Sequence, residues 1–174
     1  MSHSAARKLT SLVRGTCMLG AMLGVLVLAS PAWADRGVIK FPGLHPEYVF
    51  EAEPHVLVEP FHEFHPGVGF RGTVELVDNG FISTINNTVG IGFGLDWTDK
   101  NLWIPVVMQW NFWLSENWSV FGEPGGVIRL TDERRDKVDF FAVYAGGRYH
   151  FSDTITLTMR VGRPTASIGV SFLL

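Results

Sequence analysis

Residues 165–174, the last ten of the chain, alternate between apolar and small side chains. Thr165, Ser167, Gly169 and Ser171 occupy the alternate positions and are small and polar. Successive side chains of a β-strand point to opposite faces, so a period of two is typical of a strand. This segment therefore predicts a strand with one apolar and one polar face. The apolar positions are Ala166, Ile168, Val170, Phe172 and Leu174.

The same period recurs along most of the chain. Residues 88–97, for example, place large apolar side chains at the odd positions and threonine, glycine or aspartate at the even ones. An amphipathic helix would need a period near 3.6, which these segments do not show. We therefore predict an all-β chain. Its eight strands are expected at residues 48–61, 67–77, 81–97, 102–114, 118–130, 138–151, 154–162 and 165–174.

The links between these strands alternate in character. Residues 78–80 (Asp-Asn-Gly), 115–117 and 152–153 are short and rich in turn-forming residues, and Asn-Gly is a strong hairpin signal. The other links are more polar and mostly longer, which predicts an up-and-down antiparallel order with tight turns at one end. Those links are residues 62–66, 98–101, 131–137 and 162–164.

Four prolines fall inside the predicted strands. Proline has no N–H to donate to a strand ladder, and a closed barrel has no free edge on which to place it. We therefore expect these prolines to mark bulges or strand ends. They are Pro54, Pro60, Pro105 and Pro124.

The composition is 47% hydrophobic, yet after residue 34 no apolar run approaches the ~20 residues that a membrane-spanning helix needs. A closed β-barrel is the other structure that satisfies all its backbone hydrogen bonds within lipid. The expected fold is an eight-stranded antiparallel up-and-down transmembrane β-barrel over residues 48–174, preceded by a cleavable signal peptide.

Residues 1–34 are typical of an export signal. Three basic residues precede an almost wholly apolar run at residues 17–28, and Ala-Trp-Ala follows at residues 32–34. Small residues at two of those last positions are what a signal peptidase recognises. We predict cleavage before Asp35 and a short periplasmic N-terminal tail over residues 35–47.

Removal of this signal would leave 11 basic and 17 acidic residues, because the three charges that it carries are all basic. An acidic chain argues against a nucleic-acid partner. The single cysteine, Cys17, would leave with the signal, so no disulfide is expected.

Three features indicate that the apolar face points outward, toward lipid. The polar face is rich in small residues, which suit the narrow bore of an eight-stranded barrel. It carries charges of both signs, which can pair across that bore. The lysines after residue 34 all lie outside the predicted strands. The charged positions on the polar face are Glu51, Glu53, Glu59, Glu75, Asp96, Glu123, Arg71, Arg129, Arg148 and Arg160.

Two stretches, FWLSENWSVFGEPGG at residues 112–126 and GGRYHFSDTITLTMRVG at residues 146–162, combine a strand, a tight turn and an aromatic strand. With them the chain resembles the small eight-stranded outer-membrane proteins, such as OmpX, OmpW and the membrane domain of OmpA. The resemblance implies a monomer in the outer membrane of a Gram-negative bacterium, in contact with lipid and lipopolysaccharide. It also implies that the barrel-insertion machinery recognises the last strand, although Leu174 stands where such families end on Phe or Trp.

Glu59, His62, Glu63 and His65 crowd one polar link. Imidazole and carboxylate groups are zinc-type ligands, but this spacing matches no metal motif. The alternative to a metal site is a solvated, pH-sensitive loop, and we expect neither a metal nor a cofactor.

His150 and Ser152 have the His-x-Ser spacing of barrel lipases and lipid A deacylases. A serine hydrolase also needs an acid that orients the histidine, and Asp153 adjoins the pair but is not expected to reach back to it. The alternative is a hairpin turn with an inward histidine. Serine and aspartate are ordinary turn residues.

Three hypotheses for function remain. The first is a structural or surface-interaction role in the outer membrane, through membrane integrity or contact with lipopolysaccharide or a small hydrophobic ligand. It includes no open pore, because the bore is barely wide enough for its own side chains. The second is a lipid-modifying enzyme that resembles lipid A deacylases. The third is a soluble periplasmic barrel of lipocalin type.

Overall fold

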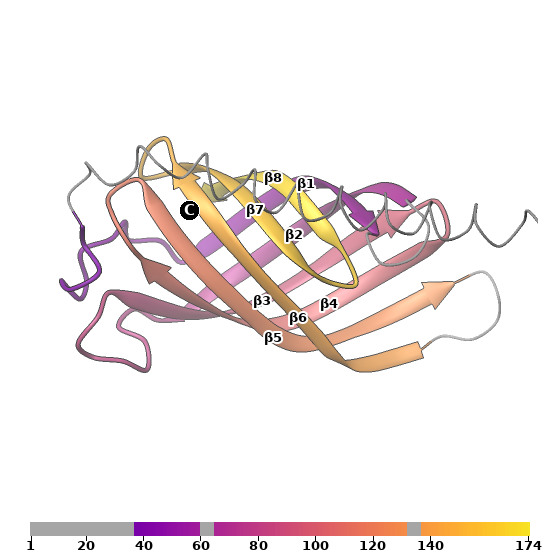
Figure 1. The fold of residues 1–174 in the computed structure, drawn as a ribbon, viewed down its shortest axis with the longest axis horizontal. Coiled ribbons are helices and arrows are strands. Elements are labelled where there is room, and N and C mark those ends of the chain that lie inside the picture. Colours follow the sequence, from indigo (N-terminus) through magenta and orange to yellow (C-terminus); the bar gives the residue numbers. More distant parts are fainter. Residues whose placement is uncertain (1–36, 60–64, 132–136) are drawn as a thin grey trace, which may run out of the picture. The chain divides into compact units, whose positions relative to one another are not determined.

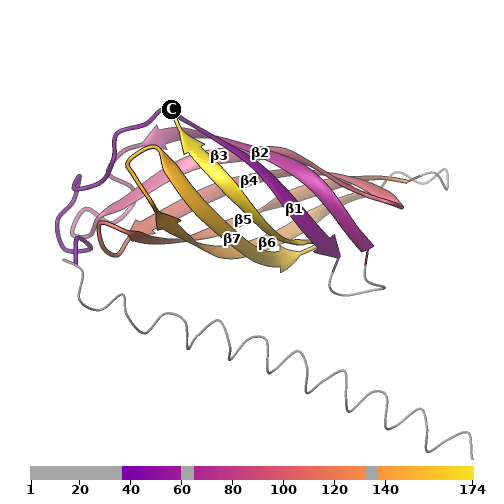
Figure 2. The same ribbon diagram turned by 90° about the horizontal axis from the view of Figure 1, so that it is seen from above.

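A computed structural model describes residues 37–59, 65–131 and 137–174. These residues form a closed barrel in which consecutive strands pair antiparallel and β1 closes against β8 (Figures 1 and 2). The predicted all-β, eight-stranded antiparallel barrel is confirmed. The strands are β1 (Phe50–Glu59), β2 (His65–Val77), β3 (Asn87–Thr98), β4 (Asn101–Trp113), β5 (Trp118–Thr131), β6 (Lys137–His150), β7 (Ile155–Arg163) and β8 (Ala166–Leu173).

Some predictions concern residues outside these described ranges. The expected signal peptide, residues 1–34, lies outside the described residues, as do Pro60, His62 and Glu63. Among the described residues, no helix is long and apolar enough to cross a bilayer.

The two faces of the strands point as the alternation predicts. Large apolar side chains lie on the outside: Trp97 is 68% exposed and Val106 is 51% exposed. At alternate positions of the same two strands, Asp96 and Gln109 point inward and are buried. The core of this barrel is therefore largely polar, and its outer surface is apolar.

Seven predicted strands begin and end within two residues of the observed ones, but the start of the third is wrong. β3 begins at Asn87, not at residue 81, and residues 78–86 form a loop instead of a tight Asn-Gly turn. The side-chain amide of Asn87 donates to the carbonyl oxygens of Ile82 and Ile85, both at 2.8 Å. Gly80 N donates to Asn87 O at 2.7 Å. This local hydrogen bonding replaces the expected strand.

Of these four prolines, the three described ones, Pro54, Pro105 and Pro124, lie inside strands, and each keeps its pairing with one neighbour. Pro54 pairs with Phe70 of β2, whereas the pairing of β1 with β8 is interrupted between Ala52 and His55 without a change of register. Pro105 pairs with β5 in a stretch where the β3–β4 pairing is interrupted, and Pro124 pairs with β6 where the β4–β5 pairing is interrupted. Only Pro124 lies next to a register shift, so bulges explain one of these three prolines.

The residues before β1, 37–49, pack across the end of the barrel that carries the tight turns and the C-terminus; we call this segment the cap (Figures 1 and 2). Val38 N donates to Leu114 O at 3.0 Å, and Asn86 N donates to Ile39 O at 2.7 Å. A small apolar cluster fixes the cap to the barrel. Its members are Val38, Tyr48, Trp113 and Leu173.

His45 of the cap lies at the same junction. Its side chain is almost completely buried, and its ring meets Trp113 edge-on at 5.3 Å between centroids. Burial lowers the pKa of His45, while the carboxylates of Asp78 and Glu47 act in the opposite direction. A lowered pKa in the docked state means that His45 binds a proton better when the cap is detached. Docking of the cap on the barrel is therefore strongest above the pKa of His45 in the detached cap, and it weakens as the pH falls below that value.

We expect hydrogen-exchange protection of residues 37–49, corrected for intrinsic exchange, to fall several-fold between about pH 7.5 and about pH 5.5. One proton limits the effect to about tenfold per pH unit. Mass-spectrometric exchange on wild type and on a His45→Gln variant measures it. An unchanged pH profile in the variant would show that His45 is not the group responsible.

Candidate functional site

The barrel interior holds the largest group of functional side chains in the described part of the chain. Arg160 of β7 lies at its centre and binds two carboxylates. Its Nη1 and Nη2 donate to the two oxygens of Glu53 at 2.7 and 2.9 Å. Its Nε and Nη2 donate to Glu123 at 2.9 and 3.2 Å. This one guanidinium therefore joins β1, β5 and β7 across the bore.

A second arginine extends the network toward β2 and β3. Arg71 donates to Glu123 at 3.2 Å and to Asp96 at 3.4 Å. Asp96 also accepts from His55 Nε2 and from the Thr165 hydroxyl, both at 3.0 Å. Gln109 of β4 also donates to Glu123, at 2.9 Å, so the connected side chains come from β1, β2, β3, β4, β5 and β7 and from the residue before β8.

The third arginine makes a separate pair nearer the cap. Arg148 donates to Glu51 through Nε and Nη2, with a shortest contact of 2.7 Å, and Nη1 donates to Asn111 Oδ1 at 2.9 Å. The ring of Phe121 lies between Arg148 and Arg160, whose guanidinium carbons are 4.3 and 5.1 Å from its centroid. A Cβ at Gly146 would collide with Phe121 Cζ, so only glycine leaves room for this ring.

The three arginines and four acidic partners of these two groups are each no more than 3% exposed. A buried charge is tolerated when it is paired and hydrogen-bonded, and each of these has such a partner. The expectation that interior charges pair across the bore is therefore confirmed for these residues. Chemically, the arrangement fills the barrel and fixes its strands, and it leaves no exposed reactive group within this layer.

The predicted metal-ligand set is only partly described. The Glu59 carboxylate accepts from Thr98 Oγ1 at 2.7 Å, Trp103 Nε1 at 3.0 Å and Asn101 Nδ2 at 3.1 Å. His65 Nδ1 is 2.9 Å from Asp99 Oδ1. Glu59 and His65 are also cross-strand neighbours, paired at the adjoining ends of β1 and β2. Within residues 37–59, 65–131 and 137–174, no three His, Cys, Asp or Glu side chains form a group that could hold a metal ion.

The predicted His-x-Ser pair lies at one turn, but the structure gives its members different partners. His150 is buried inside the barrel, and its Nε2 is 2.9 Å from Ser119 Oγ. Ser152 is exposed, and its hydroxyl accepts from the backbone N–H groups of Thr154 and Ile155. His150 Nδ1 has no hydrogen-bond partner, so no acid orients the ring of this histidine.

Several partners in this interior are not evident from the sequence. His55 and Thr165 were not expected to bind Asp96, and Ser119 was not expected to bind His150. These residues do alternate onto the polar face, which was the one available signal. A period of two identifies the face of a side chain but not its partner across the bore.

No family model and no curated protein matches this chain. The resemblance to small outer-membrane proteins therefore rests on the architecture itself, a closed eight-stranded antiparallel barrel.

The central ion-pair group predicts a large cost for removing Arg160. An Arg160→Met variant leaves Glu53 and Glu123 buried without their shared guanidinium. We expect it to lose about 3–5 kcal/mol of unfolding free energy, the usual cost of breaking a buried pair. Denaturant unfolding in detergent micelles measures this loss.

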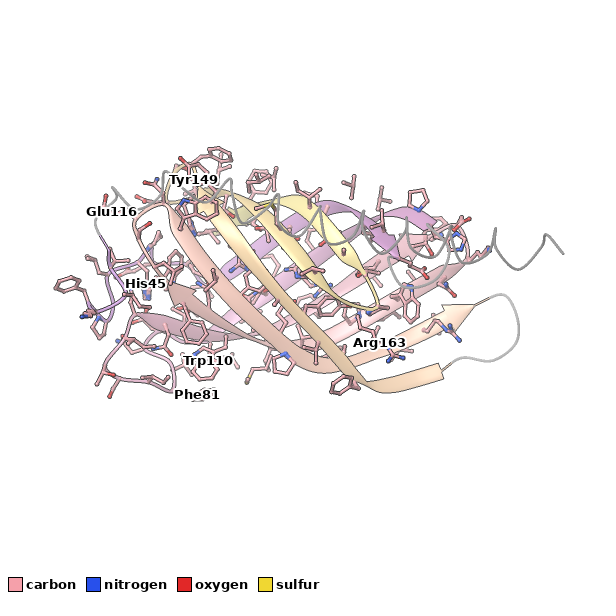
Figure 3. The ribbon with its side chains drawn as sticks, in the orientation of Figure 1. His45, Phe81, Trp110, Glu116, Tyr149 and Arg163 are labelled. Carbon is pink, nitrogen blue, oxygen red and sulfur yellow. The ribbon has the colours of Figure 1, made fainter. Side chains whose placement is uncertain are left out.

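Arg163→Met is the matched control, because Arg163 is an exposed arginine at the end of the same strand (Figure 3). We expect that control to lose less than about 1 kcal/mol. Equal losses in the two variants would show that the interior network is not what stabilises the barrel.

Proposed function

We propose that this chain is a small integral barrel of the bacterial outer membrane, with a structural or surface-interaction role and no open pore. The observation that carries the proposal is the arrangement of the two faces: apolar side chains cover the outside, and paired charges fill the inside. A lipocalin-type barrel would place its large apolar side chains inside, around a ligand.

Aromatic side chains at the cap end support a membrane location. Trp118 and Tyr149 meet edge-on at 5.1 Å, and Tyr149 meets Phe151 at the same distance. On β4, Trp110 and Phe112 lie 4.9 Å apart. Lipid-facing barrels carry such aromatic girdles where the hydrocarbon meets the headgroups. The proposed orientation places this end, with the tight turns and the C-terminus, toward the periplasm.

The proposed partners follow from this location. The outer face would contact membrane lipid and lipopolysaccharide, and the protein would act as a monomer. β8 presents Ile168, Val170 and Phe172 outward, which supports the proposal that the barrel-insertion machinery recognises this last strand. The layer around Arg160, whose charged side chains are almost completely buried, supports a closed bore.

A charge on the outer face tests the membrane location. Val106 lies near the middle of β4 and points outward. We expect Val106→Arg to lower the unfolding free energy in phospholipid vesicles by about 2–4 kcal/mol, the cost of a basic side chain at the bilayer midplane. Glu116→Arg, in an exposed tight turn, should be nearly neutral. A neutral Val106→Arg variant would rule out lipid around this strand.

Planar-bilayer recording tests the closed bore. We expect the wild-type barrel to give no stepwise conductance, because the layer around Arg160 spans the bore. Insertion is monitored separately by the heat-dependent shift in gel mobility that is typical of folded barrels. Regular single-channel steps from inserted wild-type protein would overturn the proposal of a structural role without a pore.

A further inference from the structure

Two neighbouring segments outside the strands expose large apolar side chains at the cap end of the barrel. Phe41 and Leu44 of the cap are 56% and 52% exposed, and Phe81 and Ile82 of the β2–β3 loop are 64% and 39% exposed. We call these four residues the end patch. Exposed apolar side chains that gather in this way mark an interaction surface more often than scattered ones do.

The cap half of the end patch is held by a tight turn. Leu44 N donates to Phe41 O at 3.1 Å, with Pro42 and Gly43 at the two central positions. Gly43 has a φ of +78°, which the third position of a type II turn requires and which glycine adopts without strain. The turn fixes the backbone that carries Phe41 and Leu44, so little backbone freedom remains to be lost when they bind.

Two asparagines hold the halves of the end patch from behind. Asn86 Nδ2 donates to Leu44 O at 2.7 Å, and Asn87 Nδ2 donates to Ile82 O at 2.8 Å. Both asparagines are buried. Backbone carbonyl groups of both segments are thus satisfied from the barrel side, while the apolar side chains are exposed.

The end patch is continuous with the outer apolar face. The ring of Phe81 meets Trp110 edge-on at 5.5 Å, and Trp110 lies on the outward face of β4 (Figure 3). Trp110 Nε1 donates to Asn87 Oδ1 at 2.9 Å, so its polar atom is satisfied. The apolar surface therefore passes from the strand to the loop without a break. The buried neighbours Asn86 and Asn87 hold the cap turn and this loop side by side.

We propose that the end patch is a membrane-interface anchor that inserts into the boundary between headgroups and acyl chains of the leaflet around this end of the barrel. The inference rests on the proposed membrane location. Its occupant is a lipid surface, because Phe81 and Trp110 join the patch to the lipid-facing side, and the exposed Lys40 beside Phe41 can meet a lipid phosphate. The cap is then held by the bilayer as well as by the barrel.

Lipid-borne quenching tests the anchor. Ile82→Cys and Leu44→Cys, each in a Cys17→Ser background, are labelled with bimane and inserted into vesicles of phosphatidylcholine and phosphatidylglycerol that contain a nitroxide at a shallow acyl position. Glu116→Cys, exposed in a tight turn at the same end, is the matched control (Figure 3). We expect about twofold or more quenching at Ile82 and Leu44 relative to Glu116, because interfacial groups lie within reach of the shallow nitroxide.

Val106→Cys on β4 separates this inference from the proposed function. Quenching at Val106 with none above the Glu116 level at Leu44 and Ile82 would overturn the anchor and leave the membrane barrel intact. Absence of quenching at Val106 would instead contradict the membrane location. Energy transfer between labelled copies, without lipid quenching at the end patch, would assign the patch to a second copy of this chain and also overturn the anchor.

A paired substitution tests the consequence for the cap. We expect Leu44→Ser with Ile82→Ser to lower hydrogen-exchange protection of residues 37–49 several-fold in vesicles and to leave the heat-dependent gel shift unchanged. Unchanged protection in vesicles would show that the bilayer does not hold the cap.

Discussion

The barrel depends on one electrostatic constraint: charges removed from water must find partners inside the bore. Arg160 meets this constraint by binding Glu53 and Glu123, which are 107 and 37 residues away in sequence. A shift of one residue in the register of β7 would turn this guanidinium outward, because neighbouring side chains alternate between faces. The contacts of Arg160 therefore favour one closure of the barrel over its neighbours in register. The main effect of these ion pairs is to select the strand register. Their net contribution to stability is smaller, because desolvation of the buried charges offsets much of the attraction.

Much of the fold follows from the period of two. Whether a side chain points into the bore or outward determines both the alternation in the sequence and the closed architecture. The positions of the strands and the inward direction of the charges could be predicted on this basis. The loop at residues 78–86 could not. The apolar side chains of Phe81 and Ile82 continue a strand-like pattern, but the hydrogen bonds of Asn87 to Ile82 and Ile85 depend on folded geometry. Propensity gives no information on such a contact, so the Asn-Gly signal was misleading here.

The site was predictable only to the level of residue type. That Asp96 would point inward followed from the alternation, but its binding to His55, Arg71 and Thr165 depends on how β1, β2 and the residue before β8 approach it. The prolines show the same limit. Pro105 looked incompatible with a closed barrel, yet it keeps its pairing with β5 in a stretch where the β3–β4 pairing is interrupted. The expectation that proline needs an edge strand treats a strand as a whole. In this barrel the pairing is interrupted only locally, at the residues around each proline.

The exceptions to the alternation carry information of their own. Trp113 and Leu173 are large apolar residues at positions that the pattern assigns to the polar interior, and they lie at the same end of the barrel. At this end of the bore both residues pack against apolar partners. Val38 and Tyr48 of the cap are these partners, and all four side chains are buried together. The inward apolar residues Trp113 and Leu173 thus mark where the segment before β1 packs on the barrel.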